Sequence, residues 1–332
     1  MMRITDTMPM KHYIYLVLIL CCTASIATAQ RSSKANDSLR FLLEEAGGSV
    51  HRKNYPAAIE KFNHVLAIDP NNIIALRTLG TIFMEMKDPK LAKDYFQKAY
   101  KIDPMDPALN NNLGAIASGE GKSADAIRFF ETAVRFDSTQ INFKTNLALE
   151  YAKAGQNGKA IPLLRVIDSL SPDIPAVTYT LGNCFASIGK FDSAEVFYDR
   201  SVEKGGKISE LFYHRATVKK KLGKVDQAEK DYFTALEINP NNVTCRQALG
   251  MLYINLRRFP DATKQFETLV KIDSSYVNGW IGLGACYSLS DRVPDGDKIL
   301  QRLFAKDSAM GFQMMRFIGE EANKIRAEKQ GK

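Results

Sequence analysis

Residues that commonly carry catalysis are few and scattered in this sequence. No HExxH motif occurs, and the order of serine, histidine and acidic residues suggests no catalytic triad. The run Gly279-x-x-Gly282-x-Gly284 resembles part of a nucleotide-binding loop. However, Gly284 also falls on a position of the sequence repeat, described below, that holds only Gly or Ala. The sequence therefore predicts a protein that is not an enzyme and has no catalytic residue, cofactor, metal ion or small-molecule substrate. The four histidines lie far apart, at His12, His51, His64 and His214.

The cysteines show no arrangement that binds a metal or builds a disulfide framework. Two of the five lie in an apolar N-terminal segment, and the other three, Cys184, Cys245 and Cys286, are far apart in sequence. No CxxC spacing and no Cys/His cluster is present, so a zinc site is not supported. The three later cysteines occupy small-residue positions of the repeat, where we expect buried structural thiols.

Composition and charge are those of a folded protein without a strong preference for nucleic acid. The chain has 332 residues, of which 45% are hydrophobic and 25% charged, and its formal net charge is +8. This mild excess is spread along the chain. It favours an acidic partner or an anionic surface but does not form the basic stripe that nucleic-acid binding needs. We therefore expect no nucleic acid among the partners.

The N-terminus has the features of an export signal. Lys11 precedes an apolar core at 13–22, and an Ala-Thr-Ala site ends at Ala29. A basic start, a short apolar core and small residues before the cleavage point predict a signal peptide at 1–29, followed by a polar linker at 30–38. We expect an exported, periplasmic protein.

An uncleaved membrane anchor is the alternative for the same segment. The apolar stretch runs from Tyr13 to Ala29, which is short for spanning a bilayer. A lipidated cysteine needs a small residue before it, but Leu20 precedes Cys21. No second apolar run of spanning length follows, so we expect no integral membrane span after signal removal.

A 34-residue period runs through the rest of the chain. Pro70, Pro104, Pro172 and Pro240 are separated by multiples of 34. Aligning the chain on this period needs no insertion or deletion and gives eight units. We number them repeats 1 to 8; they cover 39–72, 73–106, 107–140, 141–174, 175–208, 209–242, 243–276 and 277–310.

Small and large residues recur at fixed positions of this repeat. Positions 8 and 20 hold only Gly or Ala, and position 24 holds only Phe, Tyr or Leu, as at Phe62 and Phe96. Two antiparallel helices approach closely only where side chains are small, and a large side chain fills the space beside that contact. Each repeat is therefore predicted to be a helical hairpin, with helices at positions 2–14 and 18–30. Position 8 comprises Ala46, Gly80, Gly114, Ala148, Gly182, Ala216, Gly250 and Gly284.

The ends of the helices and of the array also follow from the residue types. Residues 311–332 are predicted to form a capping helix and tail, because Met314, Phe317 and Ile318 fall on core positions while Glu320 and Glu321 are among the charged residues around them. Position 15 is predicted to end the first helix through Gly121, Gly155, Gly189 and Gly223.

Repeat 8 resembles the tetratricopeptide repeat (TPR) family most closely. Trp280, Leu283, Gly284 and Tyr287 reproduce the family's W-x2-L-G-x2-Y core, and the repeat columns cover about four-fifths of the chain. The resemblance implies an all-α, right-handed α-α superhelix of eight hairpins plus a C-terminal capping helix. It also implies a protein or peptide partner, bound on the concave face that the first helices line.

Repeat 6 departs from the family pattern. It carries Arg215 at position 7 and Asp231 at position 23, a combination that some family members share, and we predict an ion pair between its two helices. The run from Lys219 to Lys221 lies near the helix end at Gly223 and is interpreted as a solvated helix terminus.

The resemblance assigns positions 2, 5, 6, 9, 12 and 13 to the groove. Asparagine amides there match the donors and acceptors of an extended peptide backbone, tyrosines add flat contact area, and apolar residues follow toward the C-terminus. The alternative, that these are only solvated helix faces, stays open. The groove residues that we predict are Arg77, Thr81, Asn111, Asn112, Asn142, Asn146, Tyr179, Asn183, Tyr213, His214, Lys220, Gln247, Met251 and Ile254.

Two functions remain compatible with the sequence. The first is a non-enzymatic scaffold or adaptor of the cell envelope that binds a protein or extended peptide in its concave groove. The second is a regulatory or cargo-presenting subunit of an envelope enzyme or secretion complex.

Overall fold

The computed structural model describes residues 37–290 and 292–330, and all their regular structure is helical. The predicted all-α fold is confirmed: consecutive helices pack as antiparallel hairpins, and a further helix follows the last one. The predicted signal peptide lies outside the described residues, as does the linker up to residue 36. Asp37 and Ser38, placed in the linker from the sequence, are helical. Among the described residues, none of the helices has both the length and the hydropathy needed to cross a bilayer.

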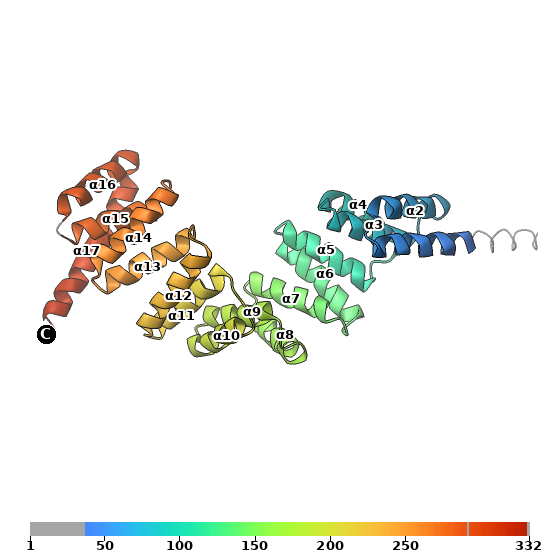
Figure 1. Ribbon diagram of the computed structural model, residues 1–332, viewed down its shortest axis with the longest axis horizontal. Coiled ribbons are helices and arrows are strands. Elements are labelled where there is room, and N and C mark those ends of the chain that lie inside the picture. The colour runs from blue at the N-terminus through green and yellow to red at the C-terminus, as the bar shows by residue number, and fades with distance from the viewer. Residues whose placement is uncertain (1–36, 291, 331–332) are drawn as a thin grey trace, which may run out of the picture. The chain divides into compact units, whose positions relative to one another are not determined.

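The described part of the chain divides into two compact bodies, an N-terminal body that ends at residue 150 and a C-terminal body that begins at residue 151, with the boundary inside α7 (Ile141–Lys153). In the N-terminal body a helix at 37–51 comes first. The start of α7 is the last element of this body. Between them lie α2 (Tyr55–Ile68), α3 (Ile73–Glu85), α4 (Pro89–Ile102), α5 (Pro107–Gly119) and α6 (Ser123–Phe136) (Figure 1).

The C-terminal body continues the same alternation of first and second helices. Consecutive helices contact one another, and the first helices of neighbouring repeats also touch, as α13 with α15. Its elements are α8 (Asn157–Leu170), α9 (Pro175–Ser187), α10 (Phe191–Glu203), α11 (Ser209–Lys221), α12 (Val225–Ile238), α13 (Val243–Asn255), α14 (Phe259–Ile272), α15 (Val277–Ser288), α16 (Val293–Lys306) and α17 (Ser308–Gln330).

Position 15 ends the first helix in a left-handed backbone conformation. The four glycines predicted there have φ between 73° and 76°, which a residue without Cβ adopts at low cost. The same conformation occurs at Lys53, Lys87 and Arg257, which occupy position 15 in repeats 1, 2 and 7. The turn is therefore a property of the repeat, whether or not the residue is glycine.

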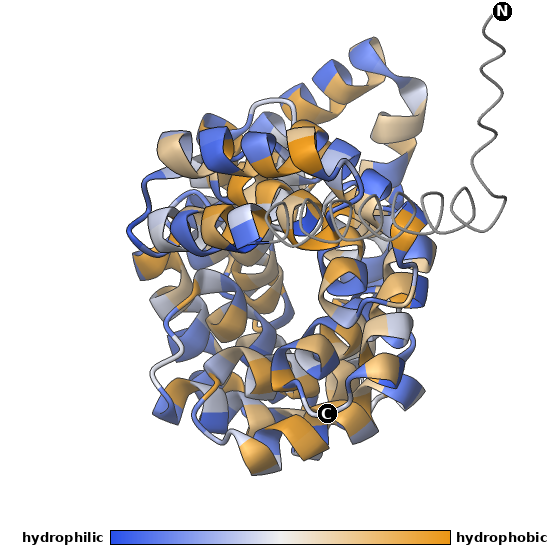
Figure 2. Cartoon of the chain, turned by 90° about the vertical axis from the view of Figure 1, so that its right-hand side faces the viewer, coloured by the Kyte–Doolittle hydropathy of each residue, from blue (hydrophilic) through white to orange (hydrophobic). Residues whose placement is uncertain are grey.

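The small residues at position 8 let the large ring at position 24 approach the helix backbone. A Cβ atom added to Gly80 would lie 2.4 Å from the Phe96 ring, and one added to Gly250 would lie 2.7 Å from the Phe266 ring. Figure 2 shows hydrophobic and hydrophilic residues alternating along the helices, as expected where one face of each helix packs inward. This confirms the packing predicted from the two columns.

The last helix covers the end of the C-terminal body. Met314 is fully buried, and its side chain lies against Gly284 of repeat 8. α17 begins at Ser308, three residues before the predicted start of the cap. Glu321, predicted among the outer charges, is only 2% exposed, because its carboxylate meets Arg257 Nη1 at 3.3 Å and Lys324 Nζ at 2.5 Å.

The ion pair predicted in repeat 6 is present. Arg215 donates from Nε and Nη2 to the two carboxylate oxygens of Asp231, at 2.8 and 2.6 Å. The interpretation of Lys219 as a solvated residue is wrong, since its ammonium lies 2.9 Å from Asp231 and the side chain is buried. A charged cluster therefore occupies the place that apolar side chains take in other repeats.

The three cysteines of the repeats are buried free thiols, as predicted. Burial raises the pKa of Cys184 to about 11 and the pKa of Cys245 and Cys286 to about 12. These thiols stay protonated near neutral pH and act as small apolar side chains.

Candidate protein-binding grooves

Four of the predicted groove residues line one cavity in the N-terminal body. This cavity of about 410 Å³ lies where α3, the start of α5 and the start of α7 meet, and we call it the N-terminal groove. Its predicted members are Arg77, Asn111, Asn112 and Asn142. The remaining lining residues are Asp106, Pro107, Ala108, Asp137, Gln140 and Phe143.

Several of the side chains that line this groove are held in place by hydrogen bonds. Arg77 Nη1 lies 2.5 Å from Asp106 Oδ2, and the other oxygen of Asp106 caps α5 by accepting from the Leu109 backbone N–H. Asn146 Nδ2 donates to Asn111 Oδ1 at 2.8 Å, which links consecutive repeats. These contacts fix the side chains before any partner arrives.

Asn112 and Asn142 offer the groove's free amides. Asn142 is exposed and Asn112 half-buried, and neither side chain hydrogen-bonds within the described part of the chain. Each amide supplies donors and an acceptor. Hydrogen bonds from Thr139, chiefly from its hydroxyl, lower the pKa of the neighbouring Asp137, so the groove also holds an ionised carboxylate.

Sequence reasoning missed the loop residues of the N-terminal groove. Asp106 and Gln140 occupy position 34 and Asp137 occupies position 31, just before the first helix of the next repeat. The prediction took groove residues from the first helices only. Thr81, which was predicted, does not line the cavity; its hydroxyl donates to the Arg77 carbonyl of its own helix.

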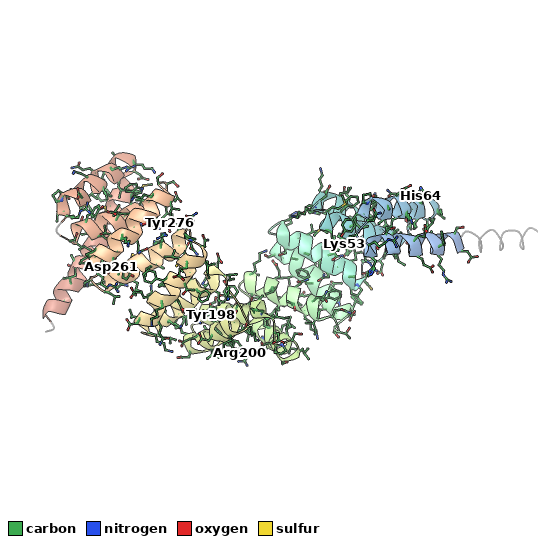
Figure 3. The ribbon with its side chains drawn as sticks, viewed as in Figure 1. Lys53, His64, Tyr198, Arg200, Asp261 and Tyr276 are labelled. Atoms are coloured by element: carbon green, nitrogen blue, oxygen red, sulfur yellow. The ribbon has the colours of Figure 1, made fainter. Side chains whose placement is uncertain are left out.

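Aromatic residues from α9 and α11 gather in the C-terminal body. The His214 ring lies 4.9 Å from the Tyr213 ring and 6.1 Å from the Tyr179 ring, between centroids. Burial lowers the pKa of His214, so its imidazole is neutral at pH 7 and packs as an aromatic side chain. Tyr198, labelled in Figure 3, is buried, and its hydroxyl donates a 2.7 Å hydrogen bond to the amide oxygen of Asn183.

Lys220 is the cation nearest in sequence to this aromatic group among the predicted residues. Its side chain is half-buried, and burial, with a contribution from Lys221, lowers its pKa. The neighbouring Lys219 is committed to Asp231. The lysine run therefore divides between the hairpin interior and the surface.

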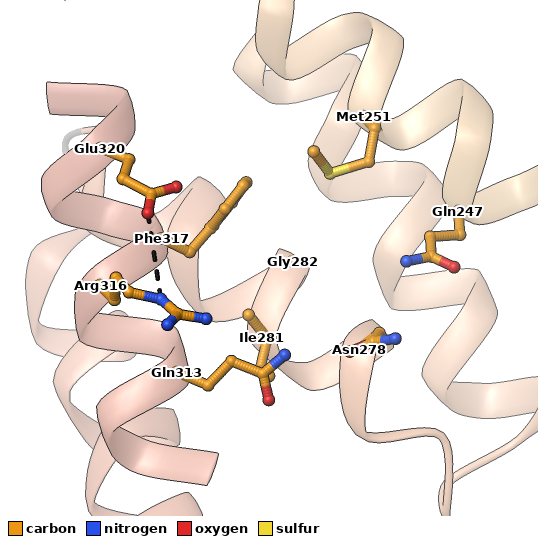
Figure 4. A pocket seen from close by; sticks show the side chains of 9 residues that line it. All are labelled: Gln247, Met251, Asn278, Ile281, Gly282, Gln313, Arg316, Phe317 and Glu320. Carbon is orange, nitrogen blue, oxygen red and sulfur yellow. Dashed lines mark ion pairs between the residues drawn. The ribbon is translucent and has the colours of Figure 1, made fainter. Parts of the chain in front are cut away.

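A second groove lies between α13, α15 and α17, and we call it the C-terminal groove. Its cavity of about 230 Å³ includes the predicted residues Gln247 and Met251 on α13 (Figure 4). Phe317, from α17 on the other side, gives the cavity an aromatic wall. Gln247 accepts a short hydrogen bond from the Tyr276 hydroxyl, which fixes its amide. The other lining residues are Asn278, Ile281, Gly282, Gln313, Arg316 and Glu320.

Ile254 does not line the C-terminal groove. Its side chain is fully buried in the core of the C-terminal body, together with Leu252 and Tyr253. The position rule of the family predicts a groove residue, but an isoleucine at this place gains more by packing against the core than by facing solvent. It is removed from the candidate site.

Family models described as tetratricopeptide repeat match two segments of the chain, residues 209–242 and 78–105. The first match has the same bounds as repeat 6, and the second falls within repeat 2. The chain contains tetratricopeptide repeats. The first helices of these hairpins contribute residues to both grooves, together with loop residues in the N-terminal groove and α17 in the C-terminal groove.

Similar proteins match part of this chain. The TPR repeat-containing protein MJ1428 of Methanocaldococcus jannaschii is 22% identical over 217 residues, covering 61% of this chain and 37% of that protein. Pseudomonas aeruginosa pilF matches in structure with a TM-score of 0.52 at 19% identity, covering 62% of this chain and 94% of that one. PilW, described as a widely conserved type IV pilus biogenesis factor, matches with a TM-score of 0.50 at 21% identity, covering 61% and 94%. This chain thus spans well under half of its curated relative, and the structural matches show the fold alone.

Proposed function

We propose that this protein is a non-enzymatic scaffold or adaptor of the cell envelope that binds an extended segment of a partner protein. The observation that carries the proposal is the clustering of Asn111, Asn112 and Asn142 in one groove beside the fixed Arg77–Asp106 pair. An extended backbone presents N–H and C=O groups at regular intervals, and preorganised amides pair with both. The partner is a protein, and export to the periplasm provides the compartment.

The charges of the N-terminal groove suit a neutral or basic segment. Asp106 and Asp137 supply two carboxylates against the single cation of Arg77. The C-terminal groove would take an apolar side chain of the same partner or of another one, because Met251, Ile281 and Phe317 line it. The N-terminal groove therefore provides backbone pairing, and the C-terminal groove provides side-chain selectivity.

The test is affinity capture from envelope extract with the purified protein and with the Asn112→Ala/Asn142→Ala variant. Two neutral hydrogen bonds contribute about 1–3 kcal/mol together, so the variant should bind its partner about 5- to 150-fold more weakly. Neither amide has a partner within the described residues, so thermal unfolding should be unchanged. Thr81→Ala is the matched control, since that hydroxyl bonds to its own helix.

The identity and stoichiometry of the captured protein separate the two functions predicted from the sequence. A partner that binds wild type and the Asn112→Ala/Asn142→Ala variant equally would refute the N-terminal groove as its site. Capture of one stoichiometric enzyme or channel component would support the second function, a regulatory or cargo-presenting subunit of an envelope complex.

A further inference from the structure

Position 11 of the repeat holds an aromatic residue in five of the eight repeats. It lies in the first helix, and in four of these repeats the ring has a described contact with the repeat's own second helix or the preceding repeat's second helix. The five residues are Phe83, Tyr151, Phe185, Tyr253 and Tyr287.

Four of these rings contact a second helix, two that of their own hairpin and two that of the preceding repeat. Phe83 stacks on Tyr95 of its own hairpin, with ring centroids 5.5 Å apart and planes at 9°. The Tyr253 hydroxyl reaches Glu229 on the second helix of the preceding repeat at 2.6 Å. Phe185 and Tyr287 make the corresponding contacts, a stack on Phe197 at 5.3 Å and a 2.7 Å hydrogen bond to Glu267.

Repeat 3 has Ala117 at this position, and the space between its hairpin and the second helix of repeat 2 is open. A cavity of about 350 Å³ lies between α4, α5 and α6, with Leu113, Ile116 and Ala117 among its lining residues. Two aromatic rings, Tyr100 and Phe129, also line it, edge to face with centroids 5.8 Å apart. This site thus resembles the place of a missing aromatic side chain. We call it the Ala117 cavity.

The two remaining repeats use position 11 differently. Lys219 of repeat 6 directs its ammonium to Asp231, and Ser49 of repeat 1 donates its hydroxyl to the Glu45 carbonyl at 3.1 Å. In both, the side chain at position 11 has a polar partner within the protein. Ala117 has no polar group, so its repeat presents an apolar floor.

The rim of the Ala117 cavity carries an excess of positive charge. Lys93, Lys101, Lys122 and Arg128 line it against the two carboxylates Glu120 and Asp125. Glu120 is shared by Lys93 and Lys122, at 2.5 and 2.7 Å. Lys101 forms no ion pair within the part of the chain that the structure describes, so its charge is available to a ligand.

We propose that the Ala117 cavity is a docking site for a phenylalanine or tyrosine side chain of a partner protein, carried in an acidic segment. We infer an aromatic side chain because five other repeats carry an aromatic residue at position 11. We infer an acidic segment because the rim of the cavity is cationic. The cavity shares no lining residue with the N-terminal groove, so it is a second, separate site.

A designed peptide tests this site directly. The probe is a fluorescein-labelled peptide with one phenylalanine flanked on each side by two acidic residues, titrated against the full-length protein at low salt and followed by fluorescence polarisation. Matched peptides replace the phenylalanine with alanine, or the acidic residues with lysine. Burial of one phenyl ring supports a preference of tenfold or more for the first peptide over the alanine peptide, and opposite charge supports a similar preference over the lysine peptide.

Ala117→Phe closes the cavity with the side chain that other repeats carry. We expect this variant to bind the acidic phenylalanine peptide at least tenfold more weakly than the wild type. Its fold should persist, because Phe83 and Phe185 occupy the same position and stack on position 23, where repeat 3 has Phe129. Thermal unfolding at an equal or higher temperature would establish this.

Lys101→Glu supplies a second variant that leaves the interior untouched. Reversing this exposed charge should weaken the peptide about three- to tenfold and make binding less sensitive to salt. The Asn112→Ala/Asn142→Ala variant should bind the peptide like the wild type, so this proposal and the groove proposal fail independently. A folded Ala117→Phe protein that binds as tightly as the wild type, or a wild type that does not prefer the phenylalanine peptide, would overturn the proposal.

Discussion

Repeats 2 and 6 share one backbone pattern but join their two helices with different side chains. In repeat 2, Leu79 at position 7 is fully buried, and Phe83 at position 11 stacks on Tyr95 at position 23. The Phe96 ring lies close to the helix backbone at Gly80. This hairpin is held by apolar contact and shape.

In repeat 6 the same three positions carry charge. Arg215 and Lys219 converge on Asp231, which is 5% exposed, and Arg215 also reaches Asp199 of repeat 5 at 2.9 Å. Position 8 is Ala216, fully buried. This hairpin is held by a buried ion cluster.

The difference shows that the 34-residue hairpin requires a fit between positions 7, 11 and 23, and not a particular chemistry. The two kinds of hairpin interface respond differently to a substitution. In an apolar interface, the loss in the free energy of unfolding is proportional to the contact removed. In an ion cluster, removing one member leaves the opposite charges buried without a partner, which costs more. Repeat 6 should therefore be the more fragile of the two to a single substitution.

Asp231→Ala tests this fragility and has the largest expected effect. It leaves the cations of Arg215 and Lys219 without their shared carboxylate, and we expect a loss of about 3–5 kcal/mol in the free energy of unfolding, measured with urea. Asp199→Asn is the matched control: that carboxylate is 44% exposed, and its loss should cost under about 1 kcal/mol. An Asp231→Ala protein as stable as the wild type would show that the cluster does not hold the hairpin.

Gly80→Ala tests the apolar hairpin of repeat 2. The added Cβ would lie 2.4 Å from the Phe96 ring. Overpacking of this kind costs about 1–3 kcal/mol, and the better helix propensity of alanine offsets up to about 1 kcal/mol. We expect a net loss of about 1–2 kcal/mol in the free energy of unfolding, smaller than that of Asp231→Ala.

The matched rescue for Gly80→Ala is a second substitution, Phe96→Leu. It reproduces the Ala148 and Leu164 combination that repeat 4 carries at positions 8 and 24. Adding it to Gly80→Ala should recover stability relative to the sum of the two single losses, as a double-mutant cycle measures. Additive losses would mean that the ring and the glycine do not pack against each other.

The 34-residue period predicted most of the fold because every repeat packs two antiparallel helices against each other at the same positions. Columns of Gly, Ala and large residues located the helices and the left-handed turns, and the resemblance to the family located the Arg215–Asp231 pair. The column rules failed where a side chain has an alternative partner outside its column. Lys219 finds a carboxylate in the hairpin interior, and Ile254 finds the apolar core of the C-terminal body.

The candidate sites were predicted less completely than the helices. The helix positions gave the amides of the N-terminal groove but not its loop carboxylates Asp106 and Asp137, because loops were left out of the groove rule. The Ala117 cavity was within reach of the sequence, since position 11 is aromatic in five of the eight repeats and alanine in repeat 3. An interruption in a repeat column becomes a site only when three-dimensional neighbours leave it open, and that requires the structure.

The smallest expected difference between repeats 2 and 6 lies at position 15. Lys87 has φ +62° and Gly223 has φ +76°, so both end the first helix in the left-handed region. A side chain there costs about 1–2 kcal/mol, and part of this is offset by the larger backbone entropy of glycine in the unfolded chain. Lys87→Gly should therefore stabilise the protein by about 0.5–1 kcal/mol, and Gly223→Lys should destabilise it by a similar amount.

Lys90→Gly, within α4, is the control and should destabilise the protein, because the backbone at this residue is helical. Thermal unfolding of the three variants measures the signs, and a loss of stability in Lys87→Gly would mean that the side chain contributes more than its backbone costs.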